Sequence, residues 1–237
     1  MDDRGRWYLR SKSYYSFGTT LHRVLQRFHD GGDQGVVTTE QALAAYEESW
    51  IDAGFTSQEE MQEAFGEGKE ILERHIEEIR SRPRDVKVLL VEKQLKMPFG
   101  DDFDLIGRID RVDEYPDGTL EIIDYKSGRQ DVSEADVESD LAMNVYQLLV
   151  HHRYPGRNVK ATIVALRTGR SASHSLSAED REVLKQDLFE LGRQILGKNW
   201  EETRSVPKAL CPVCDFLPLC RKDLEFAESI ASSESSE

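Results

Sequence analysis

The alternation of apolar and polar residues along the chain predicts a defined order of helices and strands. Apolar residues recur at helical spacing in several segments, each long enough for an amphipathic helix. These segments are residues 17–28, 41–51, 57–79, 140–153 and 177–196. Mostly apolar runs between turn signals predict strands at 86–95, 105–125 (a hairpin) and 159–167. This order predicts an α/β domain whose mixed sheet carries helices on both faces.

The hairpin at 105–125 contains a turn that determines how its strands pair. Residues 116–118, Pro-Asp-Gly, suit a three-residue loop, because Pro presets φ and Gly tolerates the left-handed conformation. Counting outward from this loop pairs Asp110 with Asp124. Cross-strand partners share a face, and alternation along the second strand adds Lys126 to it. The register therefore predicts two carboxylates and a lysine at one place.

Two facing carboxylates repel each other unless a cation lies between them. The predicted pairing of Asp110 with Asp124 therefore favours a divalent metal site. The alternative is a surface hairpin on which Asp110, Asp113, Asp124 and Lys126 are simply solvated. Glu92, in the preceding strand, is a further candidate carboxylate, although an alternating strand can equally place it in solvent.

Length and composition bound the class of protein. A chain of 237 residues can form one large domain. We expect that domain to cover 1–223, with a helical insertion at 38–82, a cysteine-rich element at 209–221 and a disordered acidic tail at 224–237. No apolar run approaches the ~18 residues of a transmembrane helix, and the charged N-terminus does not resemble a signal peptide. We therefore expect a soluble, cytoplasmic protein without a membrane partner.

The formal net charge of −14 argues against a general polyanion-binding protein, because contacts to phosphate need Lys and Arg. Bound divalent cations or a local basic strip would offset this charge. The candidates for such a strip are Arg23, Arg27, Arg108, Arg129, Arg153, Arg157 and Arg167.

An aspartate followed further along by Asp-x-Lys after an apolar run resembles the motif of the PD-(D/E)XK nuclease superfamily. GRIDRVD and IIDYKSG are similar to its RecB-type exonuclease branch. The resemblance implies a restriction-endonuclease-like fold and hydrolysis of phosphodiester bonds in DNA, single-stranded or at duplex ends, with Mg²⁺ or Mn²⁺. It also implies that Asp110, Asp124 and the backbone carbonyl of Tyr125 bind the metal. Lys126 would then assist the attacking water.

Two of the predicted helices carry further likenesses. FGTTLHRVLQRFH resembles the FGxxxH helix of RecB-like nucleases, which implies that His22 is a metal ligand, whereas His29 is expected at the surface. DLAMNVYQLLVHH resembles their QLxxY helix, with Tyr146 as a residue that faces substrate or orients the lysine. Ala142 departs from the glutamine of that pattern. Gln147 replaces it only imperfectly, because successive helical residues are turned by about 100°.

All three cysteines lie in the C-terminal segment ALCPVCDFLPLCRK. Cys211 and Cys214 have the spacing that lets two thiolates bind one metal, and Cys220 can reach the same ion. The spacing resembles the cysteine triad of iron–sulfur RecB-like nucleases, including the CRISPR-associated and AddB-type enzymes, which implies a [4Fe–4S] cluster. Zinc and unrelated buried cysteines are the alternatives. Those relatives have a fourth cysteine where this chain has Asp3. Three alternatives stay open: an upstream segment is missing, Asp3 or another group is the fourth ligand, or the site has decayed or holds zinc.

Together these features predict a metal-dependent DNA nuclease of the RecB type in repair, recombination or defence, with a helicase or a repair or CRISPR protein as partner. The alternative is a non-catalytic DNA-binding or scaffold module of a helicase–nuclease complex, which the acidic charge and Ala142 favour. A small redox protein built around the cysteines would leave the hairpin unexplained.

Overall fold

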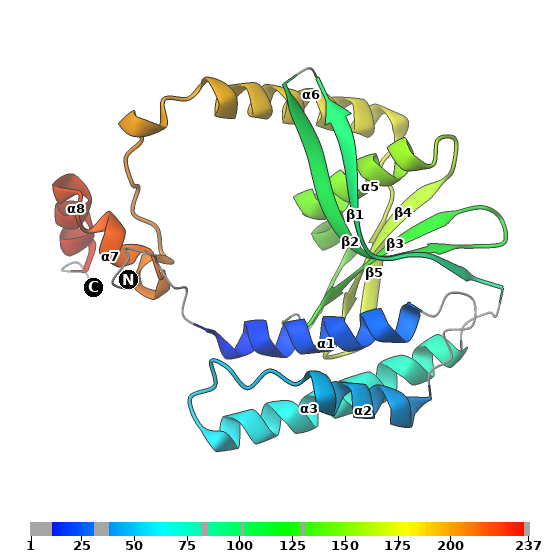
Figure 1. Cartoon of the computed structure of the whole chain (residues 1–237). Helices are drawn as coiled ribbons and strands as arrows, with labels where there is room; N and C mark the ends of the chain where they lie inside the picture. The colour runs from blue at the N-terminus through cyan, green and yellow to red at the C-terminus, as the bar shows by residue number, and fades with distance from the viewer. Residues whose placement is uncertain (1–10, 31–37, 82–84, 101, 129–130, 235–237) are drawn as a thin grey trace. The chain divides into compact units, whose positions relative to one another are not determined.

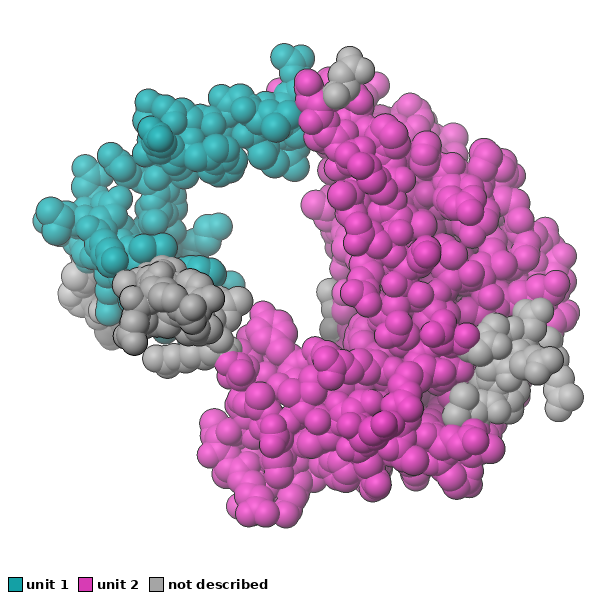
Figure 2. Space-filling view, in the orientation of Figure 1, with its two compact units in different colours: residues 1–10, 191–237 teal, residues 11–190 magenta. Residues whose placement is uncertain are grey.

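The computed structural model describes residues 11–30, 38–81, 85–100, 102–128 and 131–234. The chain forms two compact units (Figure 2), one of Ser11–Glu190 and the other of Met1–Arg10 and Leu191–Glu237. The first unit holds a β-sheet and the helices that pack on it, and the second includes the three cysteines. The single domain 1–223 stays a prediction.

A five-stranded mixed sheet forms the centre of the first unit (Figure 1). Its strands are β1 (Lys87–Phe99), β2 (Phe103–Glu114), β3 (Leu120–Lys126), β4 (Val159–Ala165) and β5 (Arg170–His174). They lie in the order β1-β2-β3-β4-β5, with β3 and β4 parallel and the other neighbours antiparallel. The mixed sheet predicted from the order of elements is confirmed.

Helices cover both faces of this sheet. The first layer consists of α1 (Ser13–His29), α2 (Thr39–Ser49) and α3 (Gln58–Ser81), which share a hydrophobic core with one face of β3 and β4. The other face packs against α5 (Leu141–Arg153), together with residues of α4 (Glu134–Ser139) and of α6 (Ala178–Gly197). Helices on both sides agree with the sequence pattern, because the strands between them are apolar on both faces.

Alternation along β3 shows how the two cores are divided. Ile123 and Tyr125 belong to the core shared with α1, α2 and α3, whereas Ile122 belongs to the core shared with α5. Successive side chains of a strand point to opposite faces, so Asp124 lies on the Ile122 side. Burying a side chain such as Ile122 or Ile123 stabilises the fold by roughly 1.5–3 kcal/mol. The apolar neighbours therefore hold the strand that carries Asp124 in place.

The hairpin between β2 and β3 has the predicted register. The Tyr115 N–H donates to the Thr119 carbonyl at 2.9 Å, and Gly118 has a φ of 87°. From there the ladder runs in step to the pair of Arg111 with Ile123. The turn chemistry at 116–118 thus predicts the pairing correctly.

Two elements of the first unit escape the sequence pattern. β5 has the sequence RSASH, which lacks the apolar alternation of a strand, and it forms by pairing with the edge of β4. α4 lies in an acidic stretch that reads as a connection. It begins with a capping box, in which the Ser133 side chain accepts from the Asp136 N–H and the Asp136 carboxylate accepts from the Ser133 N–H.

The second unit contains short helices near the C-terminus. They are the 3-10 turns η2 (Trp200–Glu202) and η3 (Cys211–Val213) and the helices α7 (Leu217–Cys220) and α8 (Leu224–Glu234). The structure differs here from the expected disordered tail, because Phe226 and Ile230 lie one helical turn apart and are both buried. Among the helices of the described ranges, none combines the length and the apolar character needed to cross a bilayer.

Candidate active site

Three acidic residues form a row across β1, β2 and β3. The β1–β2 register pairs Val91 with Arg111 and Lys93 with Ile109, and Glu92 and Asp110 fall opposite each other between these pairs. The β2–β3 register, continued by one position, places Asp110 opposite Asp124. Residues opposite each other share a face of the sheet, so these carboxylates gather in one place. We call them the acidic row.

Glu92 has an unusual backbone conformation within this row. Its φ is 47°, and no other non-glycine residue of the described ranges has a positive φ. A non-glycine residue held there costs of order 1–3 kcal/mol, and such strain concentrates at functional sites. The Arg108 Nε also donates to Glu92 Oε2 at 2.8 Å. The position of the Glu92 carboxylate is thus set by both its backbone and its ion pair.

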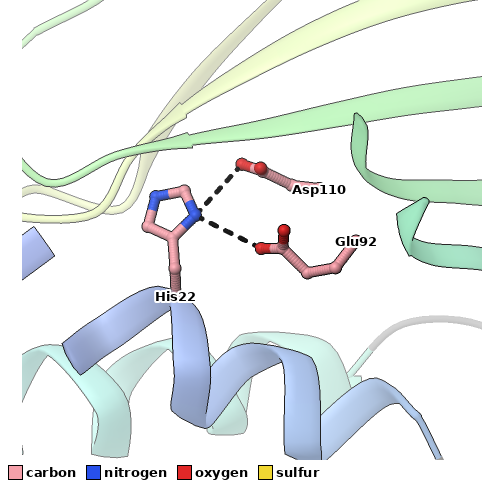
Figure 3. A group of neighbouring side chains, drawn as sticks. All are labelled: His22, Glu92 and Asp110. Carbon is pink, nitrogen blue, oxygen red and sulfur yellow. Dashed lines mark ion pairs between the residues drawn. The ribbon is translucent and has the colours of Figure 1, made fainter. Parts of the chain in front are cut away.

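Helix α1 brings His22 to Glu92 and Asp110 of the acidic row (Figure 3). Its Nδ1 lies 3.6 Å from Glu92 Oε1 and 3.5 Å from Asp110 Oδ2. Within the described ranges, His22, Glu92 and Asp110 are the one group of His, Cys, Asp or Glu side chains of three or more whose ligand atoms lie within 4.8 Å of one another. One imidazole and two carboxylates are donors that a divalent cation accepts.

The end of β3 completes the site. The Tyr125 N–H donates to Asp110 Oδ2 at 2.8 Å, and the Tyr125 carbonyl lies 3.0 Å from His22 Nε2. Lys126 places its Nζ 2.7 Å from Asp124 Oδ2. His22, Asp110 and Tyr125, all singled out from the sequence, therefore lie together with Glu92, the further candidate carboxylate. Asp124 and Lys126 line the same cleft, but Asp124 is not part of the group of three ligands.

The charged groups shift one another's pKa values. Burial raises the pKa of Asp124 and the Asp110 carboxylate raises it further, to about 6, against the opposing attraction of Lys126. Burial lowers the pKa of His22, but hydrogen bonding and charge from Asp110 and Glu92 outweigh it and raise the pKa to about 10. The site thus favours a positive charge beside the acidic row, which an imidazolium or a metal ion can supply.

Comparison with known proteins assigns the chain to a family. The model of the PD-(D/E)XK nuclease superfamily matches residues 4–221. The chain belongs to the PD-(D/E)XK nuclease superfamily. The predicted resemblance is confirmed, and so is the fold class, since the mixed sheet flanked by helices is the restriction-endonuclease-like arrangement.

Two individual proteins resemble this superfamily member. A 60-residue segment is 48% identical to one subunit of the ATP-dependent helicase/deoxyribonuclease of Clostridium tetani (strain Massachusetts / E88), a match that spans 24% of this chain and 5% of that protein. A crystal structure of a candidate exonuclease from Eubacterium rectale covers 92% of this chain and 94% of its own, with 13% identity and a TM-score of 0.38. A likeness of that size supports no inference about function.

A buried polar network lies next to the motif residues of β2 and β3. The Arg111 Nε donates to Asp113 Oδ1 at 2.6 Å, and its Nη1 donates to the Tyr125 hydroxyl at 3.0 Å and lies 2.8 Å from His29 Nε2. Arg111, Asp113 and His29 are all buried. The alternative of a solvated hairpin is therefore wrong, because Asp113 and Asp124 lie inside the protein.

The expectation that His29 lies at the surface is also wrong. The signal that could have placed it was present in the sequence, because His29 follows Leu25 by four positions and so continues the apolar stripe of α1. Its neighbours explain why a polar residue is tolerated there, since Arg111 and Tyr125 both lie within hydrogen-bonding distance.

Tyr146 on α5 lies close to the acidic row. Burial raises the pKa of its hydroxyl to about 12, and the charges of Asp124 and Asp110 raise it in the same direction. Its ring packs on Gly107 of β2, where an added Cβ would lie 2.9 Å from the ring. Gln147, in contrast, accepts from the Leu176 N–H at 2.9 Å, so its side-chain oxygen is engaged on the connection between β5 and α6.

A cleft of about 800 Å³ opens at the site. Its walls include His22, Glu92, Asp124 and Lys126. Of the arginines proposed for a basic strip, Arg23 and Arg108 line this cleft. Others form ion pairs elsewhere: Arg27 with Glu48, Arg157 with Glu114 and Arg167 with Glu67. Arg129 lies outside the described residues.

The cysteine-rich element gives a different result. Cys211, Cys214 and Cys220 are not in disulfides, and the Lys208 N–H donates to Cys211 Sγ at 3.2 Å. In the part of the chain that the structure describes, no group of three ligands within 4.8 Å includes these thiols. Asp3, the suggested fourth ligand, lies outside the described residues. Among the residues that the structure describes, these donors do not form a four-ligand site.

Proposed function

We propose that this protein is a divalent-metal-dependent deoxyribonuclease, a RecB-like exonuclease that hydrolyses phosphodiester bonds in DNA. The observation that carries the proposal is the convergence of His22, Glu92 and Asp110 within 4.8 Å of one another. They lie beside Asp124 and Lys126, in a chain that belongs to a nuclease superfamily. The cleft at this point is open to solvent and large enough for a nucleotide unit.

The donors fit a magnesium or manganese ion. Carboxylates and carbonyls suit both metals, and an imidazole adds a ligand that manganese accepts well. We assign metal binding to His22, Glu92, Asp110, Asp124 and the Tyr125 carbonyl. When bound, such an ion polarises a phosphoryl oxygen and lowers the pKa of water. Burial and the Asp110 carboxylate raise the pKa of Asp124, and a cation bound beside it would lower that pKa.

Lys126 and Tyr146 act on the reacting groups themselves. The ion pair of Lys126 Nζ with Asp124 Oδ2, at 2.7 Å, holds the ammonium beside the acidic row and in the wall of the cleft. From there it orients the attacking water or stabilises the negative charge that develops on the phosphate. Tyr146, whose pKa responds to Asp124 and Asp110, is assigned a position on the substrate side of the same row.

The decisive experiment is digestion of end-labelled single-stranded and duplex DNA with Mg²⁺ or Mn²⁺. Asp110→Asn, Asp124→Asn and Lys126→Met should each lower the rate at least about 100-fold, because each removes a charge placed at the reacting phosphate. Asp117→Asn in the hairpin turn and Lys185→Met on α6 are the matched controls and should keep full activity. Equal activity in all variants would assign the cleavage to another protein.

The second candidate function is a non-catalytic DNA-binding or scaffold module of a helicase–nuclease complex. The net charge of −14 favours the scaffold over DNA binding, and the 60-residue match to part of a helicase/deoxyribonuclease favours the complex. On this proposal a helicase is the partner and repair, recombination or defence the setting. Titration with Mn²⁺ separates the two functions, since a nuclease should bind the ion tightly and lose that binding in Asp110→Asn, whereas a scaffold should not bind it.

We also propose that Cys211, Cys214 and Cys220 bind a metal in the full assembly, as a [4Fe–4S] cluster or zinc. Two observations support this: the three thiols lie in one short segment, and a backbone N–H already points at Cys211 Sγ. Purification without oxygen, an absorption spectrum and analysis for iron, sulfide and zinc test it. Protein free of all three elements would contradict metal binding.

A further inference from the structure

Two tyrosines at the start of α1 are exposed beside the cleft. Tyr14 is 59% exposed and Tyr15 65% exposed. Their ring centroids are 4.4 Å apart with an interplanar angle of 46°. Both residues line the same cleft as His22 and Lys126. We call Tyr14 and Tyr15 the aromatic pair.

The aromatic pair is not part of the buried stripe of α1. The buried stripe of α1 consists of other residues, including Phe17, Leu21 and Phe28. Leaving an aromatic side chain in water forgoes roughly 1.5–3 kcal/mol of burial. Exposed aromatics next to a polar cleft instead suit a ligand that presents flat apolar surfaces and charged groups together.

Tyr15 lies on the face of α1 that also carries His22, and Tyr14 lines the cleft from the adjacent position. Tyr15 precedes His22 by seven positions, or two helical turns, and Thr19 lies between them in the cleft wall. At 1.5 Å per residue this separates the two side chains by roughly 10 Å along the helix. A stacked nucleic-acid strand rises about 3.4 Å per nucleotide, so roughly three nucleotides span that distance.

We propose that Tyr14 and Tyr15 form a base-stacking subsite for single-stranded DNA, about three nucleotides from the bond that the acidic row would cleave. The inference rests on the proposed nuclease function and deepens it by naming the substrate class. Stacking requires unpaired bases, so the subsite selects a single strand over a blunt duplex.

Charge in the cleft is consistent with a backbone on this path. Arg23, Arg108 and Lys126 line the cleft beside the aromatic pair, and so do Glu92 and Asp124, which pair with Arg108 and Lys126. Arg108 is largely exposed and reaches Glu92. Local cations bind phosphates while the aromatic rings bind bases, which is the combination found in proteins that hold single strands without sequence preference.

Binding of a fluorescent thymidine dodecamer, measured by anisotropy in EDTA, tests the subsite without requiring cleavage. Tyr14→Ala/Tyr15→Ala should weaken binding about tenfold or more, and Tyr14→Phe/Tyr15→Phe should recover most of that loss, because the ring does the stacking. Binding of a blunt duplex of the same length should change less than twofold. Tyr154→Ala, a tyrosine at the end of α5, is the matched control and should bind as the unmodified protein does.

The result separates the two proposals. If the unmodified protein binds the dodecamer, depends on the aromatic pair and yet degrades no DNA with Mg²⁺ or Mn²⁺, the nuclease function fails and the subsite stands. If it degrades DNA while the double alanine variant binds within twofold of it, the subsite is overturned and the nuclease stands. Equal losses in the alanine and phenylalanine variants would also overturn it, since they would show that the hydroxyls rather than the rings make the contact.

Discussion

The backbone N–H of Tyr125 donates a hydrogen bond to Asp110 Oδ2 at 2.8 Å. The carboxylate of one strand is thereby oriented by the backbone of the next. The same tyrosine presents its carbonyl to His22 and its hydroxyl to Arg111. The geometry of the acidic row is thus connected, through one residue, to the polar network buried beneath α1.

That connection predicts that Asp113→Asn destabilises the fold. The substitution leaves the buried Arg111 guanidinium without its charged partner, which typically costs about 3–5 kcal/mol. Guanidinium chloride unfolding measures the change. Nuclease activity at a temperature where the variant stays folded should fall as well, because Tyr125 loses part of its support.

The exposed ion pair of Glu182 with Lys185 on α6 provides the control. Glu182→Gln should change the free energy of unfolding by under about 1 kcal/mol, because surface pairs contribute little. Equal losses in the two variants would contradict the role given to burial.

The positive φ of Glu92 predicts that a glycine substitution there is more stable than an alanine substitution, the reverse of the order at an ordinary strand position. Both Glu92→Gly and Glu92→Ala remove the carboxylate, so both should weaken Mn²⁺ binding. Gly adopts a positive φ without strain, whereas Ala at the same position remains strained. The glycine variant should therefore be more stable by about 1 kcal/mol. Thermal unfolding of the two apo proteins measures the difference.

An ordinary strand position shows the opposite order, because Gly there is less stable than Ala by roughly 0.5–1 kcal/mol. If Glu92→Ala proves the more stable variant, the strained conformation at Glu92 is wrong. Metal binding that survives both substitutions would remove Glu92 from the ligand set while leaving the backbone argument intact.

Local signals explain which parts of the site were predictable. The turn at 116–118 specifies the pairing of Asp110 with Asp124, because loop length and strand period determine register. His22 follows from a short helical motif. The sequence makes Glu92 only a candidate site residue, because nothing in VEKQL indicates that its backbone has a positive φ.

Non-local packing explains what was missed. Nothing in the local sequence indicates that Arg111 and Asp113 are buried, and the partner that His29 of α1 offers to Arg111 comes from far along the chain. β5 is likewise a strand only because β4 offers it an edge. Sequence patterns report the period of an element well, but not which helix from elsewhere covers its polar face.

The close packing of Leu149 and Tyr146 on Gly107 predicts that a side chain at position 107 lowers both stability and nuclease activity. A Cβ at this position would lie 2.7 Å from Leu149 Cδ1 and 2.9 Å from the Tyr146 ring. Gly107→Ala should therefore destabilise the protein by about 1–3 kcal/mol and displace Tyr146. Urea unfolding and nuclease rate measure the two effects.

Gly66→Ala in α3 is the matched control, because a Cβ there meets nothing within 4 Å. It should stabilise the helix by up to about 1 kcal/mol and leave the nuclease rate unchanged. If Gly107→Ala leaves both the stability and the nuclease rate unchanged, the predicted tight contact between Gly107 and the Tyr146 ring is wrong.

His151 on α5 predicts how stability changes with pH. Burial and the nearby Arg181 and Lys185 lower its pKa to about 4 in the folded protein, against about 6.5 for an unfolded chain. Between these values the unfolded chain binds a proton that the folded protein does not, so the free energy of unfolding falls as pH is lowered from 6.5 to 4. His151→Leu should flatten that decline. His152→Leu, at the exposed neighbouring position, should not, and parallel pH profiles for the two variants in urea unfolding between pH 4 and pH 6.5 would show that His151 titrates normally.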